Sequence, residues 1–228
     1  TFPNTPGTGC WKRALDKTAD RPYIPPPGRT SDARERLVES GTELMHERGY
    51  TAVGVSELCE AAEVKKGSFY YFFPSKVDRA LAVIDRHSTA SKQALDQLAS
   101  GDGPPLERLA AYTEGLRELH VEVYESCGQV LGCPIGNLGL EMSTQEPALR
   151  ERLRQVFDHY VASLETVLDE AVDRGDLAPL DAHQTACSIL ALAEGSVMLA
   201  KMKNDPEVLG SLKRDVFRLI GADAPIVA

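Results

Sequence analysis

Apolar residues recur at intervals of three and four from Thr30 almost to the end of the chain, and no stretch alternates apolar and polar residues at period two. One such stripe is formed by Leu149, Leu153, Val156, Tyr160, Leu164, Val167 and Ala171. This spacing matches the 3.6-residue turn of an α-helix. The chain has 228 residues, 43% of them apolar, which is enough for one large or two small domains with a core. The sequence therefore predicts an all-α fold of about nine helices.

Proline and glycine clusters divide this helical pattern. Residues 1–28 contain six of the fourteen prolines and show no sustained period, which predicts a flexible N-terminal arm. The run GDGPP at 101–105 interrupts the pattern again. We therefore expect a domain of short helices with a connecting helix over 29–98, and a helical bundle over 99–228.

Cysteine, histidine and apolar patterns narrow the class of protein. The five cysteines stand far apart without a C-x-x-C pair, which argues against a disulfide scaffold or a zinc finger. The histidines show no metal-ligand spacing, so we expect no metal site and no cofactor. No apolar run approaches the ~18 residues of a membrane span, and the start TFPNTPGTGCWKR lacks the apolar core of a signal peptide. These features predict a cytoplasmic protein with no membrane partner.

The formal net charge of −9 is unevenly distributed. Residues 1–98 carry 14 basic and 13 acidic side chains, whereas residues 99–228 carry 11 and 21. An acidic C-terminal part excludes indiscriminate binding to polyanions, because affinity for nucleic acid comes largely from cations on phosphate. The N-terminal part is close to neutral, which leaves room for specific contacts through a few cations. The two parts are thus expected to have different partners.

The segment 49–76, GYTAVGVSELCEAAEVKKGSFYYFFPSK, contains two short helical patterns separated by a tight turn at Glu63 and Val64. The first spans 55–62 and the second about 66–73, where Pro74 ends it. Helices this short bury little surface alone, so they must pack against the longer helix expected before residue 49. The result is a three-helix head with one free helix face. In that geometry a helix enters the major groove of DNA.

This segment resembles the helix-turn-helix of the TetR family of transcriptional regulators. The family pattern is similar to A-G-V-[small]-x-G-[TS]-[aromatic/Leu]-Y-x-[YH]-F-x-[SN]-K. The residues that match it are Ala62, Val64, Gly67, Ser68, Phe69, Tyr70, Phe72, Phe73, Ser75 and Lys76. Two positions depart from the family: Glu63 stands where glycine is usual at the turn, and Gly54 replaces a threonine that often touches a phosphate.

The resemblance implies a DNA-binding surface, to which we assign Lys65, Lys66, Gly67, Ser68, Tyr70, Tyr71 and Lys76. Most of these would face bases, whereas Tyr70 and Lys76 would hold phosphates through a hydroxyl and an ammonium. Lys65 is equally explained as an ordinary solvated lysine. The interleaved Phe69, Phe72 and Phe73 are expected in the core, because aromatic residues at helical spacing usually pack inward.

The resemblance also implies that residues past about 99 bind an effector and form a homodimer through the last two helices. The run LGCPIGNLGLEM (131–142) resembles a subgroup that responds to small electrophiles or unsaturated carboxylates, in which some members sense through a cysteine at this place. The same subgroup tends to carry a lysine where Lys201 stands. If Cys133 and Lys201 are close, the ammonium would favour the thiolate or bind a ligand carboxylate. The alternative is that Cys133 is a buried thiol behaving as a small apolar residue.

Further candidates for this effector site share a place on the expected C-terminal helices: Tyr112, His120, Met142, Phe157, Tyr160, Glu194 and Met198. Glu194 interrupts the apolar run 189–199, which favours a buried polar role with Lys201 as a candidate partner. His120 lies on an apolar stripe, where a core histidine is more typical than a ligand.

These features predict a homodimeric regulator that is a repressor rather than an enzyme. It would bind a palindromic double-stranded operator and be released by an effector in the C-terminal domain. The alternative is an all-α ligand carrier or enzyme with an architectural helix-turn-helix. No nucleophile–base–orienter set, phosphate loop or metal quartet in the sequence supports that alternative.

Overall fold

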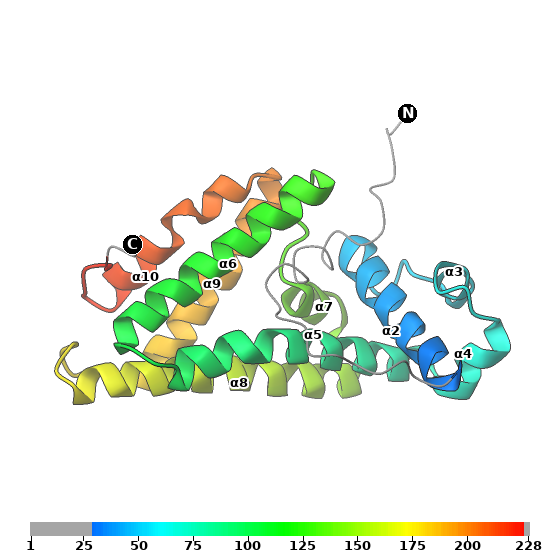
Figure 1. Ribbon diagram of the computed structural model, residues 1–228, viewed down its shortest axis with the longest axis horizontal. Helices are drawn as coiled ribbons and strands as arrows, with labels where there is room; N and C mark the ends of the chain where they lie inside the picture. Colours follow the sequence, from blue (N-terminus) through cyan, green and yellow to red (C-terminus); the bar gives the residue numbers. More distant parts are fainter. Residues whose placement is uncertain (1–28, 226–228) are drawn as a thin grey trace. The chain divides into compact units, whose positions relative to one another are not determined.

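The computed structural model describes residues 29–225, and this part of the chain is all-α (Figure 1). The elements in order are α2 (Arg29–Arg48), α3 (Val55–Ala61), α4 (Lys66–Phe72), α5 (Lys76–Ser100), α6 (Pro105–Cys127), α7 (Pro134–Met142), α8 (Pro147–Asp173), α9 (Ala182–Lys203), the 3₁₀-helix η1 (Pro206–Ser211) and α10 (Leu212–Leu219). The predicted all-α class with about nine helices is confirmed. The N-terminal arm predicted over 1–28 lies outside the described residues. The chain from Pro206 to Leu219 forms the 3₁₀-helix η1 followed directly by α10.

The described helices belong to two compact units. The head unit contains residues 29–90 and 134–153, and the bundle unit contains residues 91–133 and 154–225. The division falls inside α5 and α8, and it assigns α7 to the head unit. A continuous helix carries no local signal for such a division.

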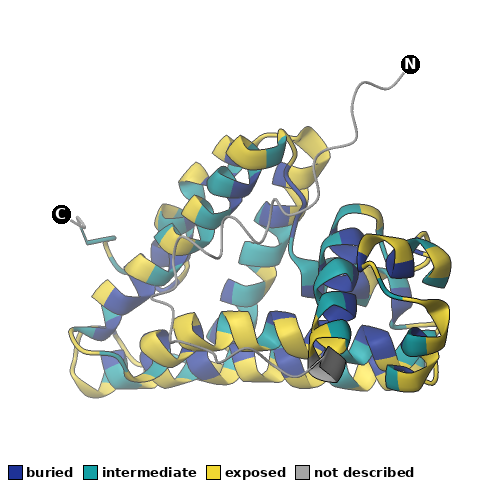
Figure 2. Ribbon diagram, turned by 45° about the vertical axis from the view of Figure 1, so that its right-hand side comes forward, coloured by how far each residue is buried: buried dark blue, intermediate teal, exposed yellow. Residues whose placement is uncertain are grey.

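The head unit buries the apolar faces of α2 to α5. Leu37, Leu58, Phe69 and Ile84 come from four different helices, and none of these side chains is exposed. Figure 2 colours the buried residues of the ribbon dark blue. Phe73 is also buried and its ring lies 5.8 Å from that of Phe69, whereas Phe72 is only half-buried. The core role predicted for Phe69 and Phe73 thus matches the structure.

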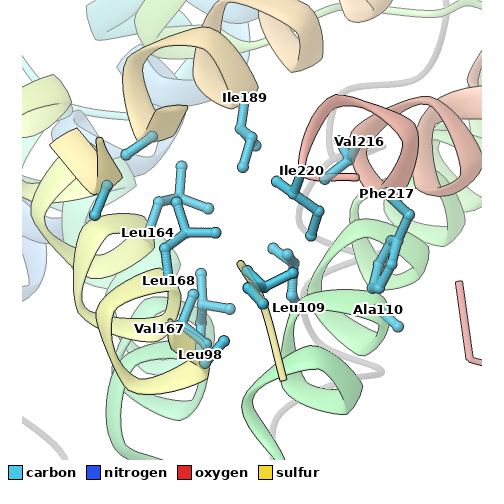
Figure 3. Close-up of a cluster of buried hydrophobic side chains, with 14 of the residues drawn as sticks. Leu98, Leu109, Ala110, Leu164, Val167, Leu168, Ile189, Val216, Phe217 and Ile220 are labelled. Carbon is cyan, nitrogen blue, oxygen red and sulfur yellow. The ribbon is translucent and has the colours of Figure 1, made fainter. Parts of the chain in front are cut away.

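The bundle unit is built around side chains from α5, α6, α8, α9 and α10 (Figure 3). Its fully buried members include Leu98, Leu109, Leu168 and Val216. Arg108 ties the end of α5 to the bundle, because it donates to the Leu98 carbonyl at 2.9 Å and pairs with Glu170 on α8. A buried guanidinium needs such partners to offset its loss of hydration.

Helix α9 is the one described helix that is long and apolar enough to cross a membrane by length and composition alone. Glu194 interrupts the apolar run of this helix. The core helix of a soluble protein can have the same length and apolar composition, and α9 contributes Ala186 and Ile189 to the bundle core. Only 22% of its apolar window is buried, however. The exposed large apolar side chains of α9 are Met198, Leu199 and Met202, near its C-terminal end.

The buried His87 on α5 predicts that the protein loses stability in mild acid. Burial, and secondarily Arg86, lowers its pKa to about 4 from the usual 6.5. The unfolded chain therefore binds the proton more tightly, and the free energy of unfolding falls as the pH drops from 6.5 toward 4. We expect a loss of about 2 kcal/mol between pH 7.5 and 5 from this residue, measured by urea denaturation. The variant His87→Gln should lack this part of the pH dependence, and identical pH profiles for both proteins would contradict the assignment.

The turn between α3 and α4 offers a stabilising substitution. Glu63 has a φ of +52°, in the left-handed region where a side chain costs about 1–2 kcal/mol. Glycine removes that cost but loses about 0.5–1 kcal/mol through its freedom in the unfolded chain. We therefore expect Glu63→Gly to raise the free energy of unfolding by about 0.5–1 kcal/mol. The control Glu60→Gly, within α3, should lower it by a similar amount. A loss of stability in Glu63→Gly would show that the turn is not strained.

Candidate DNA-binding surface and effector site

Helix α4 presents a polar and aromatic face to solvent. Tyr70 is 58% exposed and Tyr71 74% exposed, which is unusual for large aromatic side chains. Lys65, Lys66 and Gly67 at the start of the helix are also exposed, and Ser68 is half-buried. A Cβ placed on Gly67 would touch nothing within 4 Å, so the backbone here is open to a close approach. Six of the seven predicted DNA-contacting residues are thus on one short helix or at its start.

The turn that positions α4 closes on the end of α3. The Val64 amide donates to the Cys59 carbonyl at 2.8 Å, and the Glu63 amide donates to the Glu60 carbonyl at 3.0 Å. This pattern, with a left-handed residue at its centre, ends a helix and redirects the chain. Glycine suits such a position, which explains why the family prefers it where this chain has Glu63. Gly54 begins α3 without a side-chain cap, so the hydroxyl that a threonine would offer there is absent.

Lys76, the seventh predicted DNA-contacting residue, opens α5 and is held within the head unit. Its Nζ lies 3.3 Å from the Thr51 carbonyl oxygen and 4.4 Å from the centre of the Tyr50 ring. Burial, and next the charge of Arg79, lowers the pKa of Lys76, while Glu141 raises it. Ser75 precedes it and forms a reciprocal cap, with the Asp78 amide donating to its hydroxyl. The cap fixes the start of α5 and with it the Lys76 side chain.

Four of the predicted effector-site residues come together in the bundle unit. Tyr112 comes from α6, Cys133 from the segment before α7, Tyr160 from α8 and Glu194 from α9. The thiol of Cys133 donates a hydrogen bond to the Glu194 carboxylate. Thus the partner of Glu194 is Cys133, and Lys201 is not among the groups that shift its pKa. The four side chains form what we call the thiol cluster.

The electrostatics of the thiol cluster favour protonated side chains. Burial, and then Cys133 and Glu194, raises the pKa of Tyr112 to about 12. Burial also raises the pKa of Tyr160, against a hydrogen bond from Ser91 that lowers it. Burial raises the pKa of Glu194, and the bond from Cys133 partly offsets this. At neutral pH both phenols are therefore protonated and can donate hydrogen bonds to a ligand oxygen.

The segment that carries Cys133 is attached to the end of α9. Asn204, which terminates α9 in a left-handed conformation, accepts from the Val130 amide at 2.9 Å and donates to the Gly128 carbonyl at 3.1 Å. Cys133 also packs against a small apolar cluster that includes Val197 and Ala200 of α9. The position of the thiol is thus set by α9.

The remaining predicted effector residues lie elsewhere or have other roles. Phe157 is half-buried with its ring 5.8 Å from that of Tyr160, so it borders the thiol cluster. His120 is buried and its Nδ1 lies 2.8 Å from the Leu116 carbonyl, as in a core histidine. Met198 and Lys201 are exposed on α9. Met142 is buried but belongs to the head unit, whereas the cluster belongs to the bundle unit.

Two contacts were missed in the sequence. Glu141 binds the junction after α2, about 90 residues away in the chain, and no periodic pattern announces such a pairing. The second contact has a sequence signal: Cys187 follows His183 by four residues, and its Sγ lies 3.9 Å from the histidine Nε2. Glu165 binds the other ring nitrogen at 2.9 Å. His183 and Cys187 thus have an i, i+4 ligand spacing, and the expectation that no histidine has such a spacing was wrong.

Comparisons with known proteins agree with this geometry. Residues 37–83 match the model of bacterial regulatory proteins of the TetR family, and residues 105–216 match the tetracyclin repressor-like C-terminal domain. The chain is 34% identical over 184 residues to the transcriptional regulator AcuR of Cereibacter sphaeroides, covering 80% of this chain and 82% of the relative. It is 34% identical over 145 residues to the transcriptional repressor NemR of Escherichia coli, covering 63% and 69%.

The fold also resembles a solved structure, the regulatory protein TetR from Rhodobacter sphaeroides. The TM-score is 0.74 at 33% sequence identity, and the match covers 82% of this chain and 98% of that one. An exposed helix-turn-helix, a helical C-terminal domain and relatives that match along most of their length lead to one conclusion. The chain belongs to the TetR family of DNA-binding transcriptional regulators.

Proposed function

We propose that the protein is a homodimeric repressor that binds a palindromic operator through α4. The observation that carries this proposal is the division of the aromatic run on α4. Phe69 is completely buried and fixes the helix, while Tyr70 and Tyr71 project into solvent beside Lys65 and Lys66. Tyrosine hydroxyls and lysine ammonium groups bind phosphates and base edges. Acting on DNA, the protein would work in the cytoplasm.

The exposed apolar face of the bundle unit supports a homodimer through α9 and α10. Met198, Leu199 and Met202 on α9 are 46%, 46% and 75% exposed, and Leu219 on α10 is 47% exposed. Exposed apolar surface of this kind is typical of a protein interface. A two-fold axis through these helices would give the dimer two copies of α4, one for each half-site of a palindrome.

The thiol cluster supports an electrophile as the effector. No cation is among the groups that shift the pKa values of Tyr112, Tyr160 and Glu194, so none of these groups would pair with the carboxylate of an acidic ligand. Two protonated phenols are instead suited to bind the oxygen of a neutral carbonyl compound. A ligand can release DNA only to the extent that it binds the released state better. Covalent addition to Cys133, which immediately precedes α7, would supply that difference.

The alternative of an all-α carrier or enzyme with an architectural helix-turn-helix is not retained. Family membership extends over both the helix-turn-helix and the C-terminal domain, and it identifies a regulator.

DNA binding through α4 can be tested by removing one exposed side chain. Tyr71→Ala should weaken operator binding at least about 10-fold without changing the fold, because one contact to a base is worth about 1–3 kcal/mol. Binding is measured by fluorescence anisotropy on an operator selected from random DNA, and the fold by circular dichroism. With about six phosphates neutralised per dimer, the log–log salt slope should be near −5.

The control for this experiment is Leu140→Ala, which removes an 81%-exposed apolar side chain from α7. It should bind the operator like the wild type. Unchanged binding by Tyr71→Ala, or a salt slope near zero on a specific operator, would refute the proposed surface.

The role of Cys133 can be tested with N-ethylmaleimide, a neutral electrophile. Treatment should release the wild-type protein from its operator, and Cys133→Ser should abolish this release, because serine does not add to the reagent under these conditions. The control Cys127→Ser removes another half-buried thiol of the bundle unit and should retain release. Release of Cys133→Ser by N-ethylmaleimide would show that the sensor is a different group.

A further inference from the structure

The turn after α2, residues Gly49 to Thr51, binds a carboxylate in the head unit, and we call this turn the cradle. Gly49 has a φ of +85°, which turns the chain so that successive donors point to one side. The Tyr50 amide donates to Oε2 of Glu141 at 2.8 Å, and the Thr51 amide donates to Oε1 at 2.7 Å. The Thr51 hydroxyl donates to Oε1 as well. Because both carboxylate oxygens are bound, the position and the orientation of the Glu141 side chain are fixed.

The Glu141 carboxylate lies close to the backbone of Gly49. A Cβ at Gly49 would lie 2.9 Å from Oε2 of Glu141, so a side chain there would require the carboxylate to shift. The left-handed backbone of Gly49 also favours glycine, because other residues rarely adopt it.

The surroundings of the cradle are cationic. Hydrogen bonds from Thr51 and Tyr50 and the charge of Lys76 outweigh the effect of burial and lower the pKa of Glu141. In return, Glu141 raises the pKa of Lys76, which Arg79 lowers. Arg79 is completely buried, and its three guanidinium nitrogens have no hydrogen-bond partner. The Glu141 carboxylate thus supplies negative charge near the two cations Lys76 and Arg79. Lys76 is also a proposed phosphate ligand.

Helix α7 connects this cradle to the thiol cluster along the chain. It begins at Pro134, directly after Cys133, and Glu141 is its penultimate residue. Nine residues of α-helix span about 13 Å and move as a rigid rod. Hydrogen bonds of 2.7–2.8 Å weaken steeply with displacement, so a small shift of this rod must open the cradle.

We propose that Glu141 is the positioning residue through which α7 controls the helix-turn-helix. In the effector-free protein its carboxylate holds the α2–α3 junction and Lys76 in the arrangement that binds the operator. Displacement of α7 by the effector withdraws the carboxylate, which releases the junction and leaves Lys76 beside Arg79 without its counter-charge. This inference rests on the proposed function and names the contact that transmits its signal.

The test compares Glu141→Gln with Glu60→Gln, an exposed residue of α3 whose substitution changes the charge of the head unit equally. The measured quantity is the ratio of operator affinities without and with N-ethylmaleimide treatment. We expect a ratio of about 5–150 for the wild type and for Glu60→Gln, as for typical allosteric coupling. Glu141→Gln should bring it below about 3, because an amide nitrogen cannot accept the backbone hydrogen bonds. A wild-type ratio in Glu141→Gln would overturn the proposal.

Amide hydrogen exchange on the DNA-free protein gives a second readout. The Tyr50 and Thr51 amides should exchange at least about 10-fold faster in Glu141→Gln than in Glu60→Gln, with other head-unit amides unchanged. N-ethylmaleimide should accelerate the same two amides in the wild type but not in Cys133→Ser. Failure of the wild type to bind any operator would refute the proposed function alone. Failure of the reagent to accelerate these amides, while it modifies Cys133, would refute the role of Glu141.

Should Glu141→Gln not fold, Thr51→Val removes only the hydroxyl donor and keeps the volume of the side chain. It should lower the affinity ratio by a smaller amount, and a ratio equal to that of the wild type would count against the proposal.

Discussion

Two helices of seven residues are too short to persist in water, so the DNA-binding head depends on the apolar contacts that hold α3 and α4. Leu58 and Phe69 are the anchors, each without exposed surface. Because the anchor of α4 is buried, its neighbours in sequence must point outward. The exposure of Tyr70 and Tyr71 is therefore a consequence of packing as much as of function. The same constraint brings Lys76 to the start of α5, since Pro74 and the Ser75 cap end one helix and begin the next.

Periodicity and local signals predicted the features that depend on neighbouring residues. The inward Phe69 and outward Tyr70 follow from helical spacing, and the turn at Glu63 follows from the break between two short apolar patterns. Features that depend on distant pairs left no such trace. The bond between Glu141 and Thr51 joins residues from separate parts of the chain, and the bond between Glu194 and Cys133 depends on how α9 is rotated. The division inside α5 was hidden for the same reason, because the helix itself is continuous.

The structure shows how the charged residues of the chain are distributed between the two units. Most of the excess acid belongs to the C-terminal part, while the cations expected on DNA stand within residues 65–76. Three acidic residues of the region after 99, Glu141, Glu146 and Glu151, nevertheless belong to the head unit, and Glu141 raises the pKa of its Lys76. Net charge alone therefore describes neither unit. What decides the behaviour of Lys76 is a carboxylate supplied by another helix.

Asn204 links the segment that carries Cys133 to α9, the helix proposed to form the dimer interface. By binding both Gly128 and Val130, it attaches the segment of Cys133 to the end of the helix that also carries the exposed Met198 and Met202. In a dimer joined through α9, the Cys133 segments of both protomers would be attached to helices of one shared interface. Modification of Cys133 in one protomer would then alter the interface to which the second Cys133 segment is also attached. The response to an effector would be steeper than that of two independent switches, and the steepness would be set by α9 rather than by the reactivity of the thiol.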